Sequence, residues 1–553
     1  MEGDTDELSI SLSERWIWIT IPLILVLLPF SIPLQKTEIA GAGPDVISTI
    51  WAMWWFQQEW SGAAWGGESQ LFNFPFGGAG AILSPISAVL WSLLDFCFGA
   101  ARATTYTDII LLWLTMGSIM LVGRRLGLSL LACSAMSILL VLPRYPIFTL
   151  GETGVVGVAV LPVLWGLYCL VSIDKGKNPR YYGVGIAIFM AMQGVENPYL
   201  VFVLPLFVLI GLVFSSHRKK MILPFCGGLF LMALVGILLR GSSGSYESIR
   251  PSGATRLGSL HFWVVEREWA RASLESLWQA RRVIWPSGSM DSIHIHGREF
   301  LGWSGFSLGV LGMITQPRRV LPWVILGLLG LLLTTGSDWG GFPSLFGLMN
   351  SVAMNVVRAL TQPTRYFLLY SIGFGISAGF ALQWILKRNI WIAILLWGVM
   401  IGEALFFGGL SLRMPSTALP ESSCLNEMEW DGAVLVWPWD GADDLWLEST
   451  LQSRIFQMVH SQPGATIGTG SWFLVGTKFP GHRLRELGWR KAMEGKGQLQ
   501  VSQLSNWGYR YVIVDKTTGR LLERRARDEV LGEENRLKSC DTIDIYQLPQ
   551  PSL

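Results

Sequence analysis

Residues 39–60 read IAGAGPDVISTIWAMWWFQQEW, and residues 71–85 read LFNFPFGGAGAILSP. Both segments belong to the stretch 35–103, which follows the first apolar run of the chain. The stretch is too polar at its start to span a bilayer, and it is too rich in Trp, Phe and Gly to be a slack linker. Its tryptophans suit a membrane–water interface, where amphipathic rings are enriched; they are Trp51, Trp54, Trp55, Trp60 and Trp65. We therefore expect a structured loop that the remaining helices hold over a cavity.

The composition indicates a polytopic membrane protein. Hydrophobic residues make up 51% of the 553 residues and charged residues only 15%, whereas soluble proteins contain roughly 25% charged residues. The formal net charge of +2 gives no sign of nucleic-acid binding. The apolar run after Arg15 is long and no small-residue cleavage site follows it, so we expect it to remain as the first membrane helix.

Apolar runs recur along residues 1–410 and predict membrane helices, which need about 17 to 25 residues. We count eleven runs, a few of them short, at 16–34, 104–122, 128–145, 153–173, 181–195, 198–214, 221–239, 301–315, 320–335, 366–386 and 390–410. A twelfth run, 82–98, is ambiguous. We expect an all-α polytopic membrane domain over 1–410, with about eleven spans plus re-entrant or interfacial helices.

Short basic links between the runs indicate the topology, because short cytoplasmic loops are enriched in Lys and Arg. They lie at 124–125, 175–180, 218–220, 318–319 and 387–388, and all fall on one side of the membrane. If the run 82–98 crosses the membrane, the first loop lies on the cytoplasmic side together with the basic links, and the N-terminus lies outside. We favour the alternative, because this run is short, begins with Ser84 and Pro85, and contains Asp95. The N-terminus is then cytoplasmic, and the loops 35–103 and 240–300 are extracytoplasmic.

The composition changes near residue 411 to that of a small soluble domain. GAVLVWPWD, YRYVIVDK and TIDIYQL are typical of strands, and STLQSRIFQMVHS is typical of a helix. We therefore expect an extracytoplasmic α/β domain over 411–553. Cys424 and Cys540 lie near its two ends, and either form a disulfide in this oxidising compartment or stay unpaired.

Three acidic residues converge on the outer side in this topology. Asp45 follows Gly43 and Pro44, and is interpreted as a general base, a metal ligand or a helix cap. Glu152 and Glu196 lie at outward turns, where a carboxylate either faces a cavity or is a solvated loop acid.

Two arginines and two histidines are further candidates. Arg144 and Arg365 match phosphate geometry through paired donors, although snorkelling to lipid headgroups is an equal alternative. His294 and His296 form an HxH pair that presents both imidazoles on one side of a strand, which is a usable but weak metal-binding pattern. A divalent metal ion is therefore left open as a cofactor.

The order of these features resembles bacterial members of the GT-C glycosyltransferase superfamily. The resemblance rests on loose motifs: GPDVISTIWAMWW, LFNFPFGGAGAILSPIS, VGRRLGLSLLACSAM, LPRYPIFTLGE, ENPYLVF, REFLGWSGFSLGVLG and QPTRYFLL, with GAVLVWPW and NWGYRYVIVDK in the tail. It covers nearly the whole chain. The resemblance implies an inverting transferase in the bacterial inner membrane that uses a polyprenyl-phosphate-linked sugar and a glycan or protein acceptor on the extracytoplasmic side.

The resemblance also implies roles for individual residues. Asp45 matches by place the acid of the first outward loop, which acts as base or positions the acceptor, and Glu152 matches an acid of the second loop. Arg365 and Arg144 become candidates for the lipid phosphate. No DxD-like pair is present in the second loop, so metal dependence is in doubt. Glu196, Asn197 and Tyr199 of ENPYLVF complete the candidates for substrate binding.

Two other functional classes fit part of the pattern. A transporter or lipid-linked sugar flippase also needs many helices and intramembrane charge, but transporters commonly contain inverted repeats, and we find none in the sequence. A non-catalytic relative that binds lipid-linked glycans without turnover differs from a transferase by as little as one carboxylate, so the sequence separates these two readings poorly.

Overall fold

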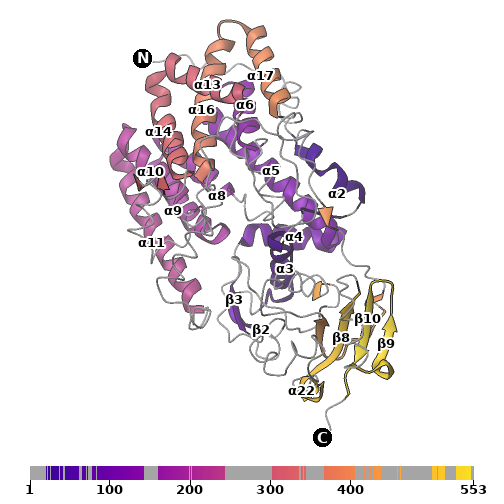
Figure 1. Cartoon of the computed structure of the whole chain (residues 1–553). Coiled ribbons are helices and arrows are strands. Elements are labelled where there is room, and N and C mark those ends of the chain that lie inside the picture. The colour runs from indigo at the N-terminus through magenta and orange to yellow at the C-terminus, as the bar shows by residue number, and fades with distance from the viewer. Residues whose placement is uncertain are drawn as a thin grey trace.

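The computed structural model describes residues 20, 23–24, 26–36, 38–41, 44–61, 65–69, 71, 78–81, 84–141, 160–197, 200, 202–242, 302–334, 338–339, 342–343, 366–404, 416–417, 424–425, 427–437, 457–458, 461, 501–506, 508–516 and 531–549. Figure 1 shows a helical bundle with a small sheet at one end. Of the predicted loop 240–300, the structure describes only residues 240–242, which form the end of helix α11 (Arg218–Ser242).

The described part of the chain is mostly helical. Its helices are η1 Leu28–Phe30, α2 Ser31–Lys36, α3 Pro44–Gln58, α4 Pro85–Phe98, α5 Ala100–Arg125, α6 Leu130–Val141, α8 Leu161–Asp174, α9 Pro179–Glu196, α10 Val203–Phe214, α11 Arg218–Ser242, α13 Trp303–Thr315, α14 Pro317–Thr334, α16 Phe367–Leu386, α17 Ile390–Ala404 and α22 Val501–Asn506. In these residues α5, α14 and α16 are long and apolar enough to cross a membrane, and six further apolar helices are shorter. Each predicted run from 104 onward coincides with a helix.

Helix α16 forms the centre of one half of the bundle and packs against α6, α13 and α14. Glycines make this packing close. A Cβ on Gly312 of α13 would lie 2.2 Å from the carbonyl oxygen of Ser377, and one on Gly373 would lie 2.3 Å from that of Trp323. Small residues at such crossings let helix backbones approach, which is typical of helix pairs in membranes.

The outer surface of the bundle is apolar. Large apolar side chains are well exposed on many of its helices, for example Leu223 and Phe230 of α11, Ile314 of α13 and Trp391 of α17. An exposed apolar surface of this extent indicates contact with lipid rather than with water.

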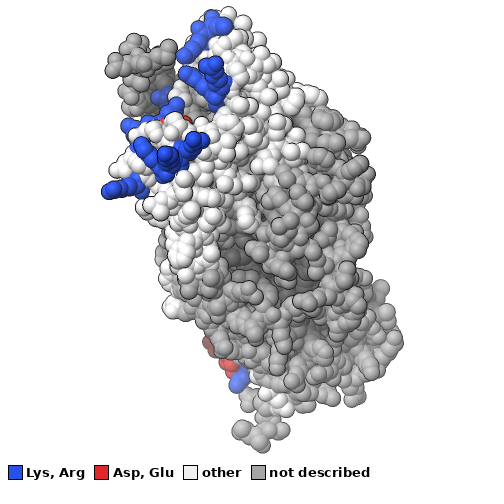
Figure 2. Space-filling model, turned by 90° about the vertical axis from the view of Figure 1, so that its left-hand side faces the viewer, with Lys and Arg blue, Asp and Glu red and all other residues white. Residues whose placement is uncertain are grey.

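Lys and Arg gather at one end of the bundle (Figure 2). The basic links form the end of α5, follow the ends of α8 and α16, and lie in the first turns of α11 and α14. Some of these side chains lie over aromatic rings: Arg125 is 5.8 Å from the ring centre of Tyr168, and Arg388 is 3.4 Å from that of Trp384. The sheet lies at the opposite end (Figure 1), so the five links share one end, as expected.

Helix α4 is the ambiguous run of the sequence. Its 14 residues lie between Ser84, which precedes the first turn, and Gly99, whose backbone φ of 80° ends the helix. A helix of this size is roughly 21 Å long, whereas the hydrocarbon core is about 30 Å thick. It lies across the lower end of α5 (Figure 1). Ser87 and Trp91 are buried, while Leu93 and Phe96 are exposed. This geometry fits an interfacial helix better than a spanning one.

The tail contains a four-stranded sheet in the order β7-β8-β10-β9. Strand β7 Ala433–Trp437 is parallel to β8 Tyr509–Asp515, and β10 Ile543–Gln547 is antiparallel to both β8 and β9 Arg536–Ser539. The three strands predicted from the sequence are thus confirmed. Of the predicted helix at 449–461, the structure describes residues 457, 458 and 461, and 457–458 are helical.

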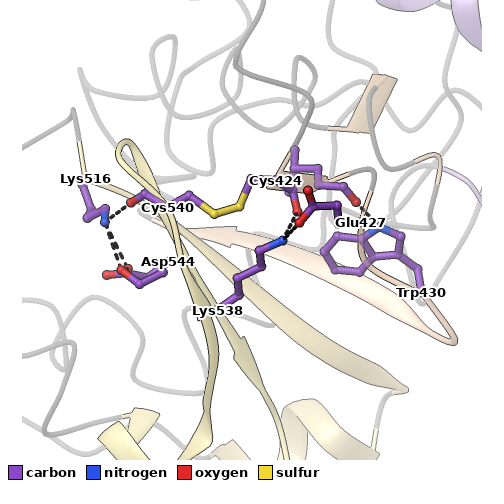
Figure 3. The surroundings of a disulfide bond; sticks show 9 residues. Cys424, Glu427, Trp430, Lys516, Lys538, Cys540 and Asp544 are labelled. Atoms are coloured by element: carbon purple, nitrogen blue, oxygen red, sulfur yellow. Dashed lines mark hydrogen bonds and ion pairs between the residues drawn. A yellow bond between two sulfur atoms is a disulfide. The ribbon is translucent and has the colours of Figure 1, made fainter.

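A disulfide joins Cys424 to Cys540, with 6.5 Å between the Cα atoms, which confirms the paired alternative. Two lysines support the ends of this bond (Figure 3). Lys538 donates a hydrogen bond to the carbonyl oxygen of Cys424 and forms an ion pair with Glu427. Lys516 donates to the carbonyl oxygen of Cys540 and forms an ion pair with Asp544. The hydrogen bond and charge of Lys538 lower the pKa of the Glu427 carboxyl. Cys424 and Glu427 are therefore fixed to β9 and to the turn that joins β9 to β10.

Candidate functional site

The first loop is tied to the tail before α3 begins. Strand β1 Ile39–Ala40 pairs antiparallel with β6 Ser416–Thr417. The hydroxyl of Ser416 donates to the carboxylate of Glu38, and that of Thr105 donates to the carbonyl oxygen of Glu38 at 3.3 Å. Three parts of the chain, namely the loop, α5 and the tail, therefore set the position from which α3 starts.

Asp45 is the second residue of α3. A carboxylate in the first turn of a helix is favoured by the helix dipole, whereas an N-cap residue stands just before the first helical residue. The capping interpretation stays a prediction. The side chain of Asp45 lies outside the described atoms. Its catalytic interpretation therefore stays a prediction. Figure 1 places α3 beyond α4, on the side of the sheet.

The tryptophans of α3 form core rather than an exposed aromatic belt. Trp51, Trp54 and Trp55 are at most 4% exposed, whereas Trp60 is half exposed. The expectation that these rings face a membrane–water interface is therefore wrong for the first three. Their burial has a physical reason: α3 is enclosed by neighbouring parts of the protein, and large rings fill that space.

One buried side chain of the tail reaches α3. Gln457 is 1% exposed. Its amide oxygen accepts from Nε1 of Trp51 at 3.0 Å, and its amide nitrogen donates to the carbonyl oxygen of Leu71. The tail thus contacts both α3 and the loop that follows it.

Glu196 holds the N-terminus of α4. Its carboxylate accepts from the backbone nitrogens of Ile86 at 2.9 Å and Ser87 at 3.3 Å, and from the Ser87 hydroxyl at 2.6 Å. Its backbone carbonyl accepts from the hydroxyl of Ser84 at 2.5 Å. Ser84 has a positive φ of 71°, a conformation that such fixed partners can maintain. Glu196 is 2% exposed, so this carboxylate is fully engaged inside the protein.

Asn197 is buried beside Glu196 and ends α9: its backbone nitrogen donates to the carbonyl oxygen of Gln193 at 2.9 Å. A small cavity adjoins Glu196. The rest of its wall is mainly apolar and comes from Ile86, Leu111, Leu112, Thr115, Val160 and Leu161. Substrate binding by Glu196 and Asn197 stays a prediction.

Sequence reasoning missed Asp108. This residue of α5 is 2% exposed and lines a second cavity with Val46, Thr49, Ile50 and Met53 of α3, Trp91 of α4, and Thr104 and Thr107. A signal was present, because Asp108 is a carboxylate inside the apolar run 104–122, and such residues usually mark function.

The remaining candidates lie outside the described residues: Glu152, Arg144, Arg365, Tyr199, His294 and His296. Within the described part of the chain, no group of three or more His, Cys, Asp or Glu side chains could hold a metal ion. The prediction of a metal site therefore stays a prediction.

No known family profile matches the chain, and no curated protein matches it in sequence. Solved structures do match its fold. The mycobacterial arabinofuranosyltransferase AftD superposes with a TM-score of 0.58 at 13% identity, covering 98% of this chain and 40% of AftD. This chain therefore spans less than half the length of that enzyme.

ArnT from Cupriavidus metallidurans, solved with undecaprenyl phosphate, superposes with a TM-score of 0.54 at 11% identity. The superposition covers 97% of this chain and 98% of ArnT. The structure of ArnT in its apo state superposes with a TM-score of 0.53 and covers the same fractions of both chains. The chain thus has the fold of the GT-C glycosyltransferases, as its sequence motifs predicted.

Proposed function

We propose that the chain is a membrane glycosyltransferase that moves a sugar from a polyprenyl-phosphate-linked donor to an acceptor on the extracytoplasmic face, with inversion and with Asp45 as base. The observation that carries the proposal is the superposition on ArnT over nearly the whole of both chains. That structure contains undecaprenyl phosphate, a lipid of the class that the donor would release.

The reaction needs few groups. The acceptor hydroxyl oxygen forms a bond to the anomeric carbon while the bond from that carbon to the donor phosphate breaks, and its electron pair leaves with the polyprenyl phosphate. The acceptor proton passes to a carboxylate, for which Asp45 is the candidate. The leaving phosphate needs charge stabilisation rather than a strong acid, and arginine supplies it. Arg365 and Arg144 are the candidates, and Glu152 is a second acid that could orient the acceptor.

Arg365 gives the binding test. Undecaprenyl phosphate should raise the unfolding temperature of the full-length protein in nanodiscs, because it binds the folded state. Arg365→Lys keeps the charge but loses the paired donors, so it should weaken this effect. Undecaprenol, which lacks the phosphate, is the matched control ligand and should show no Arg365 dependence. Equal binding of undecaprenyl phosphate to wild type, Arg365→Lys and Arg365→Ala would leave only headgroup snorkelling for this residue.

The proposal also requires the first loop to lie outside the cytoplasm. The gathering of Lys and Arg at the end opposite the sheet supports this orientation. A reporter that is active only outside the cytoplasm should therefore be active when fused after Leu553 and inactive when fused before Met1. The reverse pattern would overturn the orientation, and with it the proposed side of the reaction.

A further inference from the structure

One threonine of α5 differs from its neighbours. The hydroxyls of Thr104, Thr105 and Thr115 each donate to the carbonyl oxygen four residues earlier, at 2.9, 3.3 and 2.7 Å. This is the usual way in which a buried threonine in a helix is satisfied. Thr107 is 1% exposed, yet its hydroxyl has no hydrogen-bond partner among the described residues.

The next residue has the same property. Asp108 is 2% exposed, and within the described part of the chain it has neither a hydrogen bond nor an ion pair. A buried carboxylate without a partner is very unfavourable and is normally paired or bound to a cation. Among the described residues, two adjacent groups of one helix are therefore left without a hydrogen-bond partner at the same place.

Both groups line the cavity between α3, α4 and α5, which has room for one particle the size of a water molecule. Thr49 and Thr104 add hydroxyls to its wall. The Thr104 hydroxyl accepts a hydrogen bond from Nε1 of Trp91 and donates one to the carbonyl oxygen of Ala100. Its oxygen therefore keeps one lone pair for a further contact. The remaining lining is apolar, from Val46, Ile50 and Met53.

We propose that this cavity binds one small monovalent cation, of the size of Na⁺, through the carboxylate of Asp108 and the hydroxyl of Thr107. Oxygen atoms are the ligands that hard cations prefer. One carboxylate among neutral groups balances a single positive charge, which argues against Ca²⁺ and Mg²⁺. The alternative occupant is one buried water beside a neutral Asp108, because a water-sized cavity lined by both groups also fits that arrangement. The salt dependence of stability distinguishes the two occupants.

A cation held by these two α5 residues would lie against α3, because the opposite wall of the cavity is formed by α3 residues that begin directly after Asp45. It would therefore stabilise the helix on which the candidate base is placed. The proposal does not depend on the transfer reaction, since binding of the ion is measured without any sugar donor.

The experiment uses the purified full-length protein in nanodiscs at constant ionic strength. Replacing choline chloride with NaCl should raise the unfolding temperature in proportion to the logarithm of the Na⁺ concentration above the dissociation constant. LiCl is a second small-ion probe, and KCl should have a smaller effect because K⁺ is larger. Asp108→Asn should abolish the dependence on Na⁺.

Thr107→Val is the milder variant, and it should shift the Na⁺ response to higher concentrations. Its matched control is Thr115→Val, the same change on the same helix at a hydroxyl that bonds only to Leu111. This control should respond to Na⁺ as wild type does. Equal unfolding temperatures in all the salts would mean a neutral Asp108 with a buried water, and would overturn the proposal. A wild-type Na⁺ response in Thr107→Val or in Asp108→Asn would also overturn it.

Discussion

Asp45→Asn should abolish sugar transfer while the protein stays folded. Loss of a general base typically costs about 10²- to 10⁴-fold in rate. Asparagine has nearly the size of aspartate and loses only the interaction of the charge with the helix dipole, about 0.3 to 1 kcal/mol, so the start of α3 should be kept. Transfer is measured as the release of undecaprenyl phosphate from a lipid-linked sugar by purified protein, next to the unfolding temperature of the same sample.

The control separates this role from a general need for acids around the first loop. Asp95 lies on α4 and takes a hydrogen bond from Gln57, so Asp95→Asn removes an acid of the same region that we do not place in the chemistry. It should keep most of the transfer rate. A folded Asp45→Asn protein that transfers at the wild-type rate would remove Asp45 from the mechanism. Its function would then be to stabilise the first turn of α3, for which Asp45→Ala should cost about 0.3 to 1 kcal/mol of stability.

Much of the architecture was predictable because bilayer physics constrains the sequence directly. Apolar runs must be helical to satisfy their backbone polar groups, and each run from 104 onward coincides with a helix. The basic links gather at one end, as the charge pattern indicated. The tail strands were predictable from their alternation and β-branched residues.

The site was less predictable, because its parts meet through contacts that no local pattern encodes. Trp51, Trp54 and Trp55 resemble interfacial residues in sequence, but their burial depends on helices and a tail that fold over them. Gln457 reaches α3 from about 400 positions away in the chain, as its hydrogen bond to Trp51 records a separation of 406. Asp108 was overlooked because its apolar neighbours dominate the run 104–122, although a single acid inside such a run is itself a signal.

Glu196→Ala should both destabilise the protein and reduce transfer. The change leaves the backbone nitrogens of Ile86 and Ser87 and the Ser87 hydroxyl without their acceptor. A buried donor without a partner costs about 1 to 3 kcal/mol, so the loss should be on the order of 3 kcal/mol in total. The start of α4 would then be released from α9. Thermal unfolding measures the loss of stability, protease cleavage between residues 61 and 84 measures the release of α4, and the release of undecaprenyl phosphate measures transfer.

Glu403 offers the matched control because it caps another helix in the same way. Its carboxylate accepts from the backbone nitrogens of Trp303 and Ser304, at 2.5 and 2.8 Å, and from the Ser304 hydroxyl. Trp303 is half exposed, so water can replace part of this cap, and Glu403→Ala should cost about 1 kcal/mol. It should leave transfer and the cleavage pattern unchanged. If Glu196→Ala unfolds at the wild-type temperature, the clamp on α4 is refuted. If Glu196→Gln keeps wild-type stability but raises KM for the donor, Glu196 binds substrate instead.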